Sequence, residues 1–189
     1  DPAGIYVDGT LGMGGHSEKI AGRLDSGRLI CIDRDVTAVE YSRERLKLFS
    51  DKIIFVHANF ADTAAVLDSL GIGRVSGMLF DLGVSSPQLE EAERGFSYMK
   101  DAPLDMRMDR DDALSAFDVV NSYPQEKLEK VLREYGEERY ARRISEKILE
   151  NRPIETTLQL VEVIRSALPA KVLQKKGHPV KQTFQAIRI

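Results

Sequence analysis

The stretch that decides the fold is DGTLGMGGH, residues Asp8–His16, a glycine-rich segment between two regular elements. Gly4–Val7 before it is a short apolar run typical of a strand, and Ser17–Leu24 after it has the apolar spacing of a helix. Glycines in such a turn let the main chain approach a ligand closely. Tight strand-to-helix turns also use glycine for steric reasons alone, so the turn is a weak functional signal. It does predict the first strand–helix unit of an α/β fold.

Strands and helices continue to alternate along the chain as far as Leu82. We expect further strands at Arg28–Ile32, Ile53–His57 and Ser76–Leu82, with helices at Thr37–Phe49 and Asp62–Leu70 between them. Regular alternation of this kind implies parallel strands joined by right-handed crossovers. The predicted fold class is therefore α/β, with a doubly wound parallel sheet.

The pattern changes after the fourth strand. Leu82–Asp112 is rich in Gly, Ser, Pro and charged residues and has no clear period, and loops of this length are more often functional than idle. Beyond this segment we expect four helices, at Ala113–Asn121, Gln125–Tyr135, Glu137–Asn151 and Leu158–Ala167. The predicted architecture is an α/β half followed by an all-helical lobe.

Composition narrows the class of protein only a little. The 189 residues carry a formal net charge of -3, which gives no global sign of nucleic-acid binding. The apolar runs are too short to span a bilayer, no secretory signal opens the chain, and the single cysteine, Cys31, excludes a disulfide framework, so we expect a cytoplasmic protein. From Arg139 to Lys181, ten basic residues stand against four acidic ones. This stretch is either a phosphate-binding surface or a solvated helical face.

The glycine-rich turn departs from the dinucleotide pattern G-x-G-x-x-G. Gly12 and Gly14 supply the first two glycines, but Ser17 stands where the third should be. The carboxylate of Asp8 at the strand end would repel a pyrophosphate, whereas it could accept hydrogen bonds from the cationic amino group of a methionine moiety. These charges favour S-adenosylmethionine over NAD as the cofactor.

Two further residues are candidates for cofactor contacts. Asp33 follows the second strand a little over twenty residues beyond the glycine-rich turn, where an acid can bind both ribose hydroxyls. The alternative is an acid that caps a helix, a role for which Asp35 is better placed. Phe60, after the third strand, could lie against an adenine ring or belong to the ordinary core.

The fourth strand leads to the candidate catalytic residues. Reacting groups in open α/β sheets gather at the carboxyl ends of the central strands, which is where Asp81 stands. An exocyclic amine on a base is a poor nucleophile because its lone pair is delocalised into the ring. A carboxylate and a main-chain carbonyl that accept its two N–H bonds would aim the lone pair at a methyl donor. We assign this role to Asp81, with the main chain of Ser85 and Ser86.

The charged residues of the long loop and of the helical lobe leave alternatives open. Five aspartates between Asp101 and Asp112 could suggest a Mg²⁺ site, but an acidic flexible loop explains them better, and no metal site is predicted. Arg107 either pairs with these acids or contacts RNA. The same holds for four residues of the helical lobe, which either stack on or pair with RNA, or pack between helices with an exposed polar face: Tyr135, Tyr140, Arg142 and Arg143.

Six motifs together resemble one family, the ribosomal RNA small-subunit methyltransferase H family. They are DGTLGMGGHS at Asp8–Ser17, IDRD at Ile32–Asp35, DLGVSSPQ at Asp81–Gln88, ERGFS at Glu93–Ser97, PLDMRMD at Pro103–Asp109 and TFQAIRI at Thr183–Ile189. The third and fifth motifs are far more specific than any glycine loop, and the resemblance runs along the whole chain.

The resemblance implies a fold, a reaction and a set of site residues. The implied fold is a Rossmann-like class I methyltransferase sheet (1–104) with an inserted all-helical domain (105–179) and a return helix (180–189). The implied reaction is methylation of the N4 amine of a cytidine in the decoding region of 16S ribosomal RNA, with S-adenosylmethionine as cofactor. The implied cofactor contacts are Gly14, Gly15, His16, Asp33, Phe60, Asp81 and Gln88, to which the charge and turn arguments add Asp8 and Gly12.

The resemblance also sets expectations about partners and completeness. We expect 16S ribosomal RNA or the small subunit as partner, no membrane, and leave a homodimer open. Members of the family continue past the TFQAIRI helix, so this chain is expected to be a fragment that lacks full activity by itself. A nicotinamide-dependent oxidoreductase and a non-catalytic RNA-binding or ribosome assembly module remain the alternatives from other classes.

Overall fold

The computed structural model describes residues 1–174 and 177–188, which fold as two compact units. The first unit comprises Asp1–Ser85 with Met108–Arg110, and the second comprises Ser86–Arg107 and the residues from Asp111 onward. Lys175 and Lys176 of the predicted basic stretch, and Ile189 of the TFQAIRI motif, lie outside the described residues. The functional domains predicted with limits at 104 and 179 stay a prediction.

The first unit contains a four-stranded parallel sheet with the order β3-β2-β1-β4. The strands are β1 (Ile5–Asp8), β2 (Arg28–Asp33), β3 (Ile53–His57) and β4 (Gly77–Leu79). This confirms the predicted α/β fold class with a Rossmann-like sheet. The fourth strand is shorter than predicted, because β1 ends at Asp8, opposite Leu79, and offers no partner beyond that pair.

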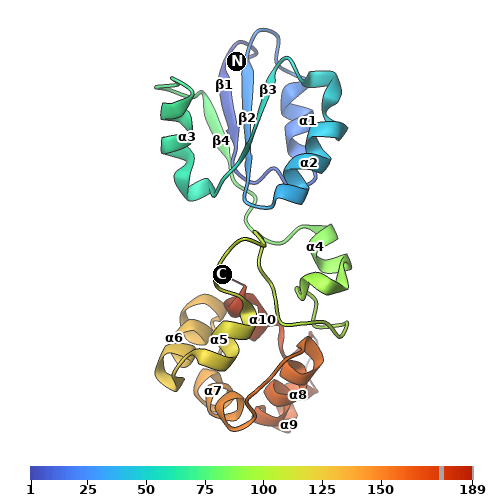
Figure 1. The fold of residues 1–189 in the computed structure, drawn as a ribbon, viewed down its shortest axis with the longest axis vertical. Coiled ribbons are helices and arrows are strands. Elements are labelled where there is room, and N and C mark those ends of the chain that lie inside the picture. The colour runs from blue at the N-terminus through green and yellow to red at the C-terminus, as the bar shows by residue number, and fades with distance from the viewer. Residues whose placement is uncertain (175–176, 189) are drawn as a thin grey trace. The chain divides into compact units, whose positions relative to one another are not determined.

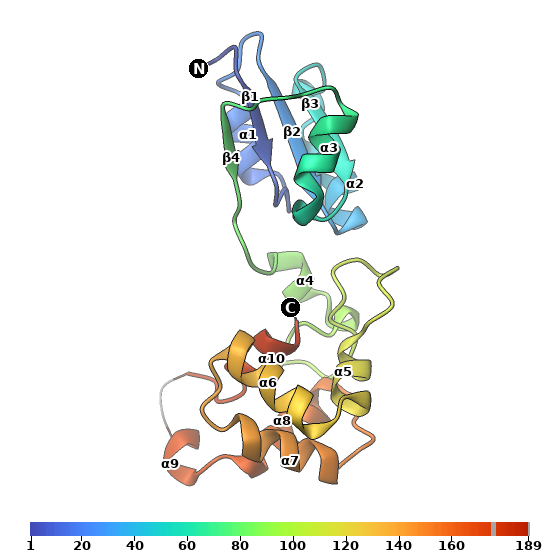
Figure 2. The same cartoon turned by 90° about the vertical axis from the view of Figure 1, so that its left-hand side faces the viewer.

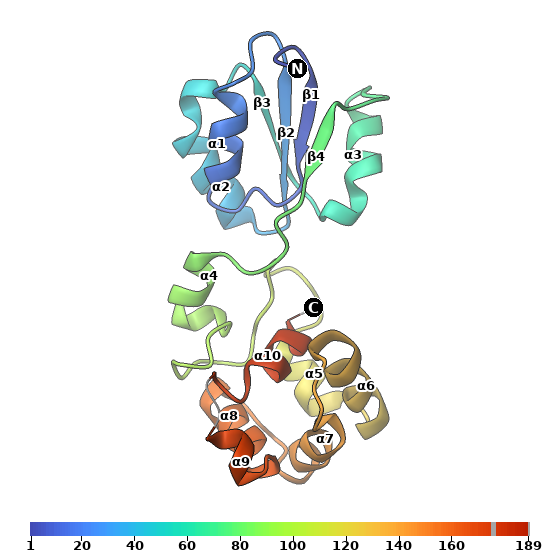
Figure 3. The same cartoon turned by 180° about the vertical axis from the view of Figure 1, so that it is seen from behind.

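Helices cover both faces of this sheet (Figures 1 and 3). Helices α1 (Gly15–Ala21) and α2 (Val36–Arg45) lie on one face, and α3 (Thr63–Ser69) lies on the other. A short 3-10 turn at Lys47–Phe49 follows α2, and another at Phe60–Asp62 precedes α3.

The central strand β2 supplies the core on both faces of the sheet. Leu29 and Cys31 belong to the apolar cluster beneath α1 and α2, and Ile30 and Ile32 belong to the cluster beneath α3. Burial of alternate residues on both sides is usual for parallel sheets, and explains why this strand is a continuous apolar run. Cys31 is a free, buried thiol, as predicted from its place in that run.

The second unit is helical (Figure 2). Its helices are α4 (Ser86–Glu90), α5 (Ala116–Ser122), α6 (Gln125–Gly136), α7 (Ala141–Glu150), α8 (Thr157–Ala167), α9 (Ala170–Leu173) and α10 (Lys181–Ile187), with a 3-10 turn at Ala92–Arg94. The helix predicted from Glu137 begins only at Ala141, because Glu137 adopts a left-handed conformation (φ 51°) that ends α6. Gly136 lets α10 approach α6 closely, since a Cβ there would lie 2.5 Å from the carbonyl oxygen of Gln182.

The ERGFS motif packs against the first five residues of the PLDMRMD motif, Pro103–Arg107, in the second unit. Gly95 has a φ of 69°, and a Cβ on it would lie 2.4 Å from the carbonyl oxygen of Pro103, so no other residue fits there. Arg94 donates a 3.1 Å hydrogen bond from Nη2 to the carbonyl of Arg107. Phe96 is fully buried, with the Arg94 guanidinium 5.6 Å from its ring centroid. These contacts give both motifs a structural role.

Candidate functional site

Parallel strands end at one edge of the sheet (Figure 2), and three predicted site residues stand at the strand ends. Asp8 is the last residue of β1, Asp33 is the last residue of β2, and Asp81 follows the end of β4 by two residues. In open α/β sheets ligands bind at this carboxyl edge, where the strand order reverses. Here the reversal falls at β1, which has β2 on one side and β4 on the other.

Hydrogen bonds to β2 and α2 hold the first part of the glycine-rich turn, whereas its last part is open to solvent. The N–H of Leu11 donates to the carbonyl of Ile32 at 3.0 Å, and the hydroxyl of Ser42 on α2 donates to the carbonyl of Gly12 at 2.7 Å. Gly12 (φ 48°) and Gly14 (φ 78°) both adopt left-handed conformations, which glycine takes without strain. A Cβ on Gly15 would meet no described atom within 4 Å. The main chain at Gly15 can therefore be approached by a ligand.

Asp33 holds the turn against β2. Its Oδ2 accepts a 2.7 Å hydrogen bond from the N–H of Gly12, and its Oδ1 accepts one of 2.9 Å from the N–H of Asp35. Burial raises the pKa of Asp33 above its ordinary value, and these two N–H groups oppose the shift. Each carboxylate oxygen has a further lone pair, so the group can still accept a hydroxyl donor. Asp35 caps α2 by accepting from the N–H of Thr37 at 3.1 Å, as predicted.

Asp8 is fully buried rather than open to solvent. Its Oδ2 accepts a 2.6 Å hydrogen bond from the hydroxyl of Ser17, and its Oδ1 accepts one of 3.2 Å from the N–H of Thr10. Cys31 Sγ lies 3.1 Å from the Ser17 oxygen, and burial raises the pKa of this thiol to about 12. Ser17 replaces the third fingerprint glycine with a donor that binds the acid of β1. Contact between Asp8 and a ligand amino group stays a prediction.

Asp81 is the exposed member of the group. Its side chain is 69% exposed, and its Oδ2 lies 3.9 Å from Nδ1 of His16, which is 56% exposed. Its main-chain N–H donates a 2.7 Å hydrogen bond to Oγ1 of Thr10. This contact was not predicted from the sequence, which gives no sign that Thr10 and Asp81 meet.

A pair of aromatic rings lies beside these acids in the first unit. The rings of Phe60 and Phe80 meet edge to face with centroids 5.9 Å apart, and each residue is 42% exposed. A Cβ on Gly9 would lie 2.2 Å from the Phe80 ring, so that ring packs directly on the start of the glycine-rich turn. Half-exposed aromatic faces suit a planar ligand group. Phe80 was missed because the sequence places it inside the predicted fourth strand.

The structure brings most predicted site residues together, but not all of them. Hydrogen bonds from Thr10 and Gly12 in the turn link it to Asp8 and Asp33. The remaining predicted residues of the first unit belong to the turn, to the start of α1 or to the segments that follow β3 and β4: Gly14, Gly15, His16, Phe60 and Asp81. Ser85 ends the first unit, whereas Ser86 and the buried Gln88 belong to α4 in the second unit. Their predicted contacts with amine or cofactor stay predictions.

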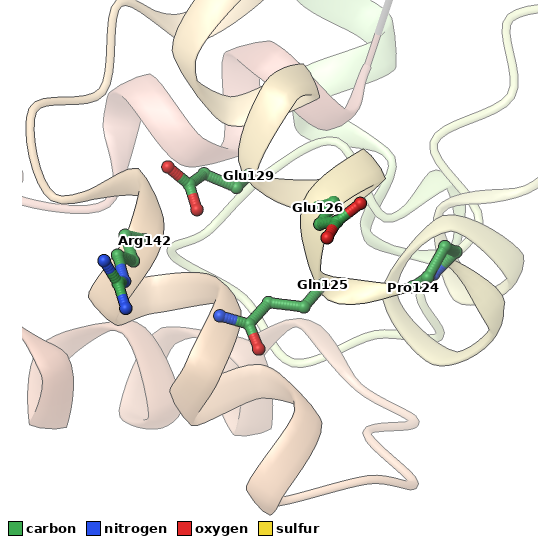
Figure 4. Close-up of a pocket in the computed structure, with 5 residues that line it drawn as sticks. All are labelled: Pro124, Gln125, Glu126, Glu129 and Arg142. Atoms are coloured by element: carbon green, nitrogen blue, oxygen red, sulfur yellow. The ribbon is translucent and has the colours of Figure 1, made fainter.

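A separate hollow of about 600 Å³ lies in the second unit (Figure 4). It is lined by Pro124, Gln125, Glu126, Glu129 and Arg142. The lining includes two carboxylates and one guanidinium, and Arg142 pairs with Glu146 at 3.1 Å. None of the five lining residues belongs to the predicted site, so this hollow is not part of it.

Charged residues of the long loop pair with other residues of the loop and with β3. Nε of Arg107 donates to Oδ1 of Asp105 at 2.6 Å, and Nη1 donates to the carbonyl of Asp112 at 2.9 Å. Asp109, which folds with the first unit, places Oδ2 3.3 Å from Nε2 of His57. Of the two roles left open for Arg107, the structure shows the pairing with loop acids.

The parallel sheet with a glycine-rich turn at its carboxyl edge defines a Rossmann-like fold, which is consistent with a methyltransferase. The sequence profile of the MraW methylase family matches residues 1–189. The chain belongs to the MraW methylase family.

Several similar proteins share one name. Proteins named ribosomal RNA small subunit methyltransferase H are 56% identical in Clostridium botulinum (strain Kyoto / Type A2), 53% in Thermobifida fusca and 52% in Streptococcus dysgalactiae, over 98% to 100% of this chain. The chain spans 58% to 61% of the length of these relatives. A solved structure, a putative rRNA-methylase from Clostridium thermocellum, aligns with a TM-score of 0.41 and 20% identity over 44% of each chain. Within the described residues, no helix has the length and apolar character of a membrane span.

Proposed function

We propose that the protein transfers a methyl group from S-adenosylmethionine to the N4 amine of a cytidine in the decoding region of 16S ribosomal RNA. Its family and the name shared by its relatives support methylation of small-subunit ribosomal RNA. The single observation that carries the proposal is the position of Asp33 and Asp81 at one edge of the sheet, on either side of the glycine-rich turn. The methylase family sets the oxidoreductase alternative aside.

The residues of the first unit fit the cofactor. When bound, S-adenosylmethionine supplies a methyl group on a positively charged sulfonium. Asp33 would accept hydrogen bonds from the ribose hydroxyls, since its oxygens keep lone pairs beside the two N–H bonds. The Gly14–His16 turn would hold the methionine end, where Gly15 leaves the main chain open. The half-exposed ring of Phe60 would lie against the adenine.

Asp81 would orient the acceptor amine. Its carboxylate is exposed and carries no described hydrogen bond, so it can accept an N–H of the amine. The main chain of Ser85 and Ser86 would accept the second N–H, which localises the nitrogen lone pair for in-line attack. The protein then contributes alignment more than a strong base. The target cytidine must leave its stack to present this amine.

The helical unit would contact RNA through its uncompensated cations. Along α6 and α7, several basic side chains pair with acids one turn away: Arg133 with Glu129, Lys130 with Glu134, Arg142 with Glu146 and Lys147 with Glu150. Arg139 and Arg143 are exposed and have no acidic partner among the described residues. They are the better candidates for phosphate contacts. This proposal places the protein with the small subunit, in the cytoplasm.

The direct test uses unmodified small ribosomal subunits and cofactor with a labelled methyl group. After incubation with the full-length protein, the RNA is digested to nucleosides, and we expect the label in N4-methylated cytidine. The Asp81→Asn variant should lose this transfer while it still binds the cofactor. Cofactor binding without any methyl transfer, or transfer to another base, would contradict the proposal. No cofactor binding at all would favour the non-catalytic assembly module.

A further inference from the structure

Thr10 lies in the glycine-rich turn, and none of the roles above uses its side chain. Its Oγ1 accepts a 2.7 Å hydrogen bond from the main-chain N–H of Asp81, 71 positions away in the sequence. Thr10 is half-buried, whereas the Asp81 side chain is largely exposed. The hydroxyl therefore joins the glycine-rich turn to the segment that follows β4.

Thr10 is itself anchored on the inner side of the turn. Its N–H donates to Oδ1 of the fully buried Asp8, whose other oxygen accepts the hydroxyl of Ser17. A β-branched side chain has few rotamers, so a fixed main chain also fixes the direction of its hydroxyl. A continuous line of hydrogen bonds thus runs from the core around Ser17 to the main chain of Asp81.

Asp81 needs support of this kind. The last residue of β4 is Leu79, so the strand ladder no longer holds the main chain at Asp81. Within residues 1–174 and 177–188, the only other hydrogen bond or ion pair of Asp81 is the 3.9 Å approach of its carboxylate to His16. A pair between two exposed groups stabilises a conformation little. The bond to Thr10 is the firmer of the two.

The geometry points to Thr10 as a positioning residue, whose hydroxyl fixes the main chain of Asp81 and thereby the place of its carboxylate. The inference rests on the proposed role of Asp81 toward the acceptor amine. Supporting contacts of this kind hold a reacting group in its productive geometry. Because methyl transfer depends on alignment, a loosened Asp81 slows the chemical step more than it weakens cofactor binding.

The test compares Thr10→Val, which keeps the shape and removes the acceptor, with Thr10→Ser, which keeps the oxygen. The first readout is the rate of amide hydrogen exchange at Asp81, measured by NMR in the absence of cofactor. We expect about fivefold to tenfold faster exchange in T10V, the size of one lost hydrogen bond, and little change in T10S. Thr37→Val, on the exposed side of α2, is the matched control and should change nothing.

The second readout is methyl transfer to small subunits by the full-length protein. In T10V we expect kcat to fall about tenfold or more, while KM for the cofactor changes less than about threefold, and T10S should restore most of the rate. Normal kcat in T10V, or slower transfer without faster exchange at Asp81, would overturn the role of Thr10. Normal turnover in Asp81→Asn would instead overturn the proposed function on which it rests.

Discussion

Replacement of Ser17 by alanine should destabilise the first unit by removing a hydrogen bond from a buried carboxylate. Ser17 and Asp8 are both fully buried, and the Ser17 hydroxyl donates to Oδ2 of Asp8 at 2.6 Å. Without it, the carboxylate keeps only the 3.2 Å bond from the N–H of Thr10. Water cannot replace the lost donor at a site with no exposed surface.

The size of the effect follows from these contacts. A hydrogen bond to a charged group contributes about 1.5–3 kcal/mol, and its loss is felt in full where the acceptor stays buried. Ser17 lies in α1, where alanine is the better helix former by about 0.5 kcal/mol. The free energy of unfolding should therefore fall by about 1–2.5 kcal/mol.

The assay is urea unfolding followed by far-ultraviolet circular dichroism, with the transition of the first unit fitted separately if the two units unfold apart. Ser69→Ala on α3 is the control, because its exposed hydroxyl bonds only to the carbonyl of Val66. The control should stay within about 0.5 kcal/mol of the unchanged protein. The reasoning is refuted if Ser17→Ala unfolds at the same urea concentration as the control.

Two other predictions concern the thiol and the helical cations. Cys31 should resist thiol reagents at pH 8 until the protein unfolds, and rapid labelling of the native protein would contradict this. Because burial raises the pKa of this thiol to about 12, its contribution to the free energy of unfolding should be fully present below the unfolded pKa near 9 and should be lost as the pH rises from 9 toward 12. Replacing both Arg139 and Arg143 by alanine should weaken RNA binding and reduce the salt slope by about 2, whereas Arg142→Ala, already paired with Glu146, should change it less; equal slopes for both variants would exclude the assignment.

The sequence predicts the strands and the edge of the sheet well. Residues 29–32 are an unbroken apolar run followed by an acid, Asp33, and that pattern indicates a central parallel strand with a polar tip. The departure at Ser17 from the glycine fingerprint was visible, but its reason was not. Only the fold shows that the serine hydroxyl binds Asp8, a contact between the end of a strand and the following helix.

Contacts between distant segments could not be predicted from one sequence. The bond between Thr10 and Asp81 depends on the pairing of β1 with β4, which local periodicity does not specify. Helix α4 was not predicted, because its five residues are too few to show a helical repeat in the sequence. Similarly, Gly95 is explained only by the approach of the Pro103 carbonyl, which belongs to another part of the long loop.

The most direct test of the account is a calorimetric titration of the protein with S-adenosylmethionine, repeated with Asp33→Asn. Asparagine keeps one acceptor for the turn but loses the charge that binds the ribose hydroxyls, so affinity should fall about tenfold or more, while Asp68→Asn on the exposed side of α3 should leave it unchanged. Burial raises the pKa of Asp33, so its carboxylate takes up a proton at a higher pH than an ordinary aspartate does. Since the protonated group is a weaker acceptor for the ribose hydroxyls, the affinity of the unchanged protein should also fall as the pH is lowered toward the pKa of Asp33. Equal affinity of Asp33→Asn and the unchanged protein would contradict a cofactor site at this edge of the sheet.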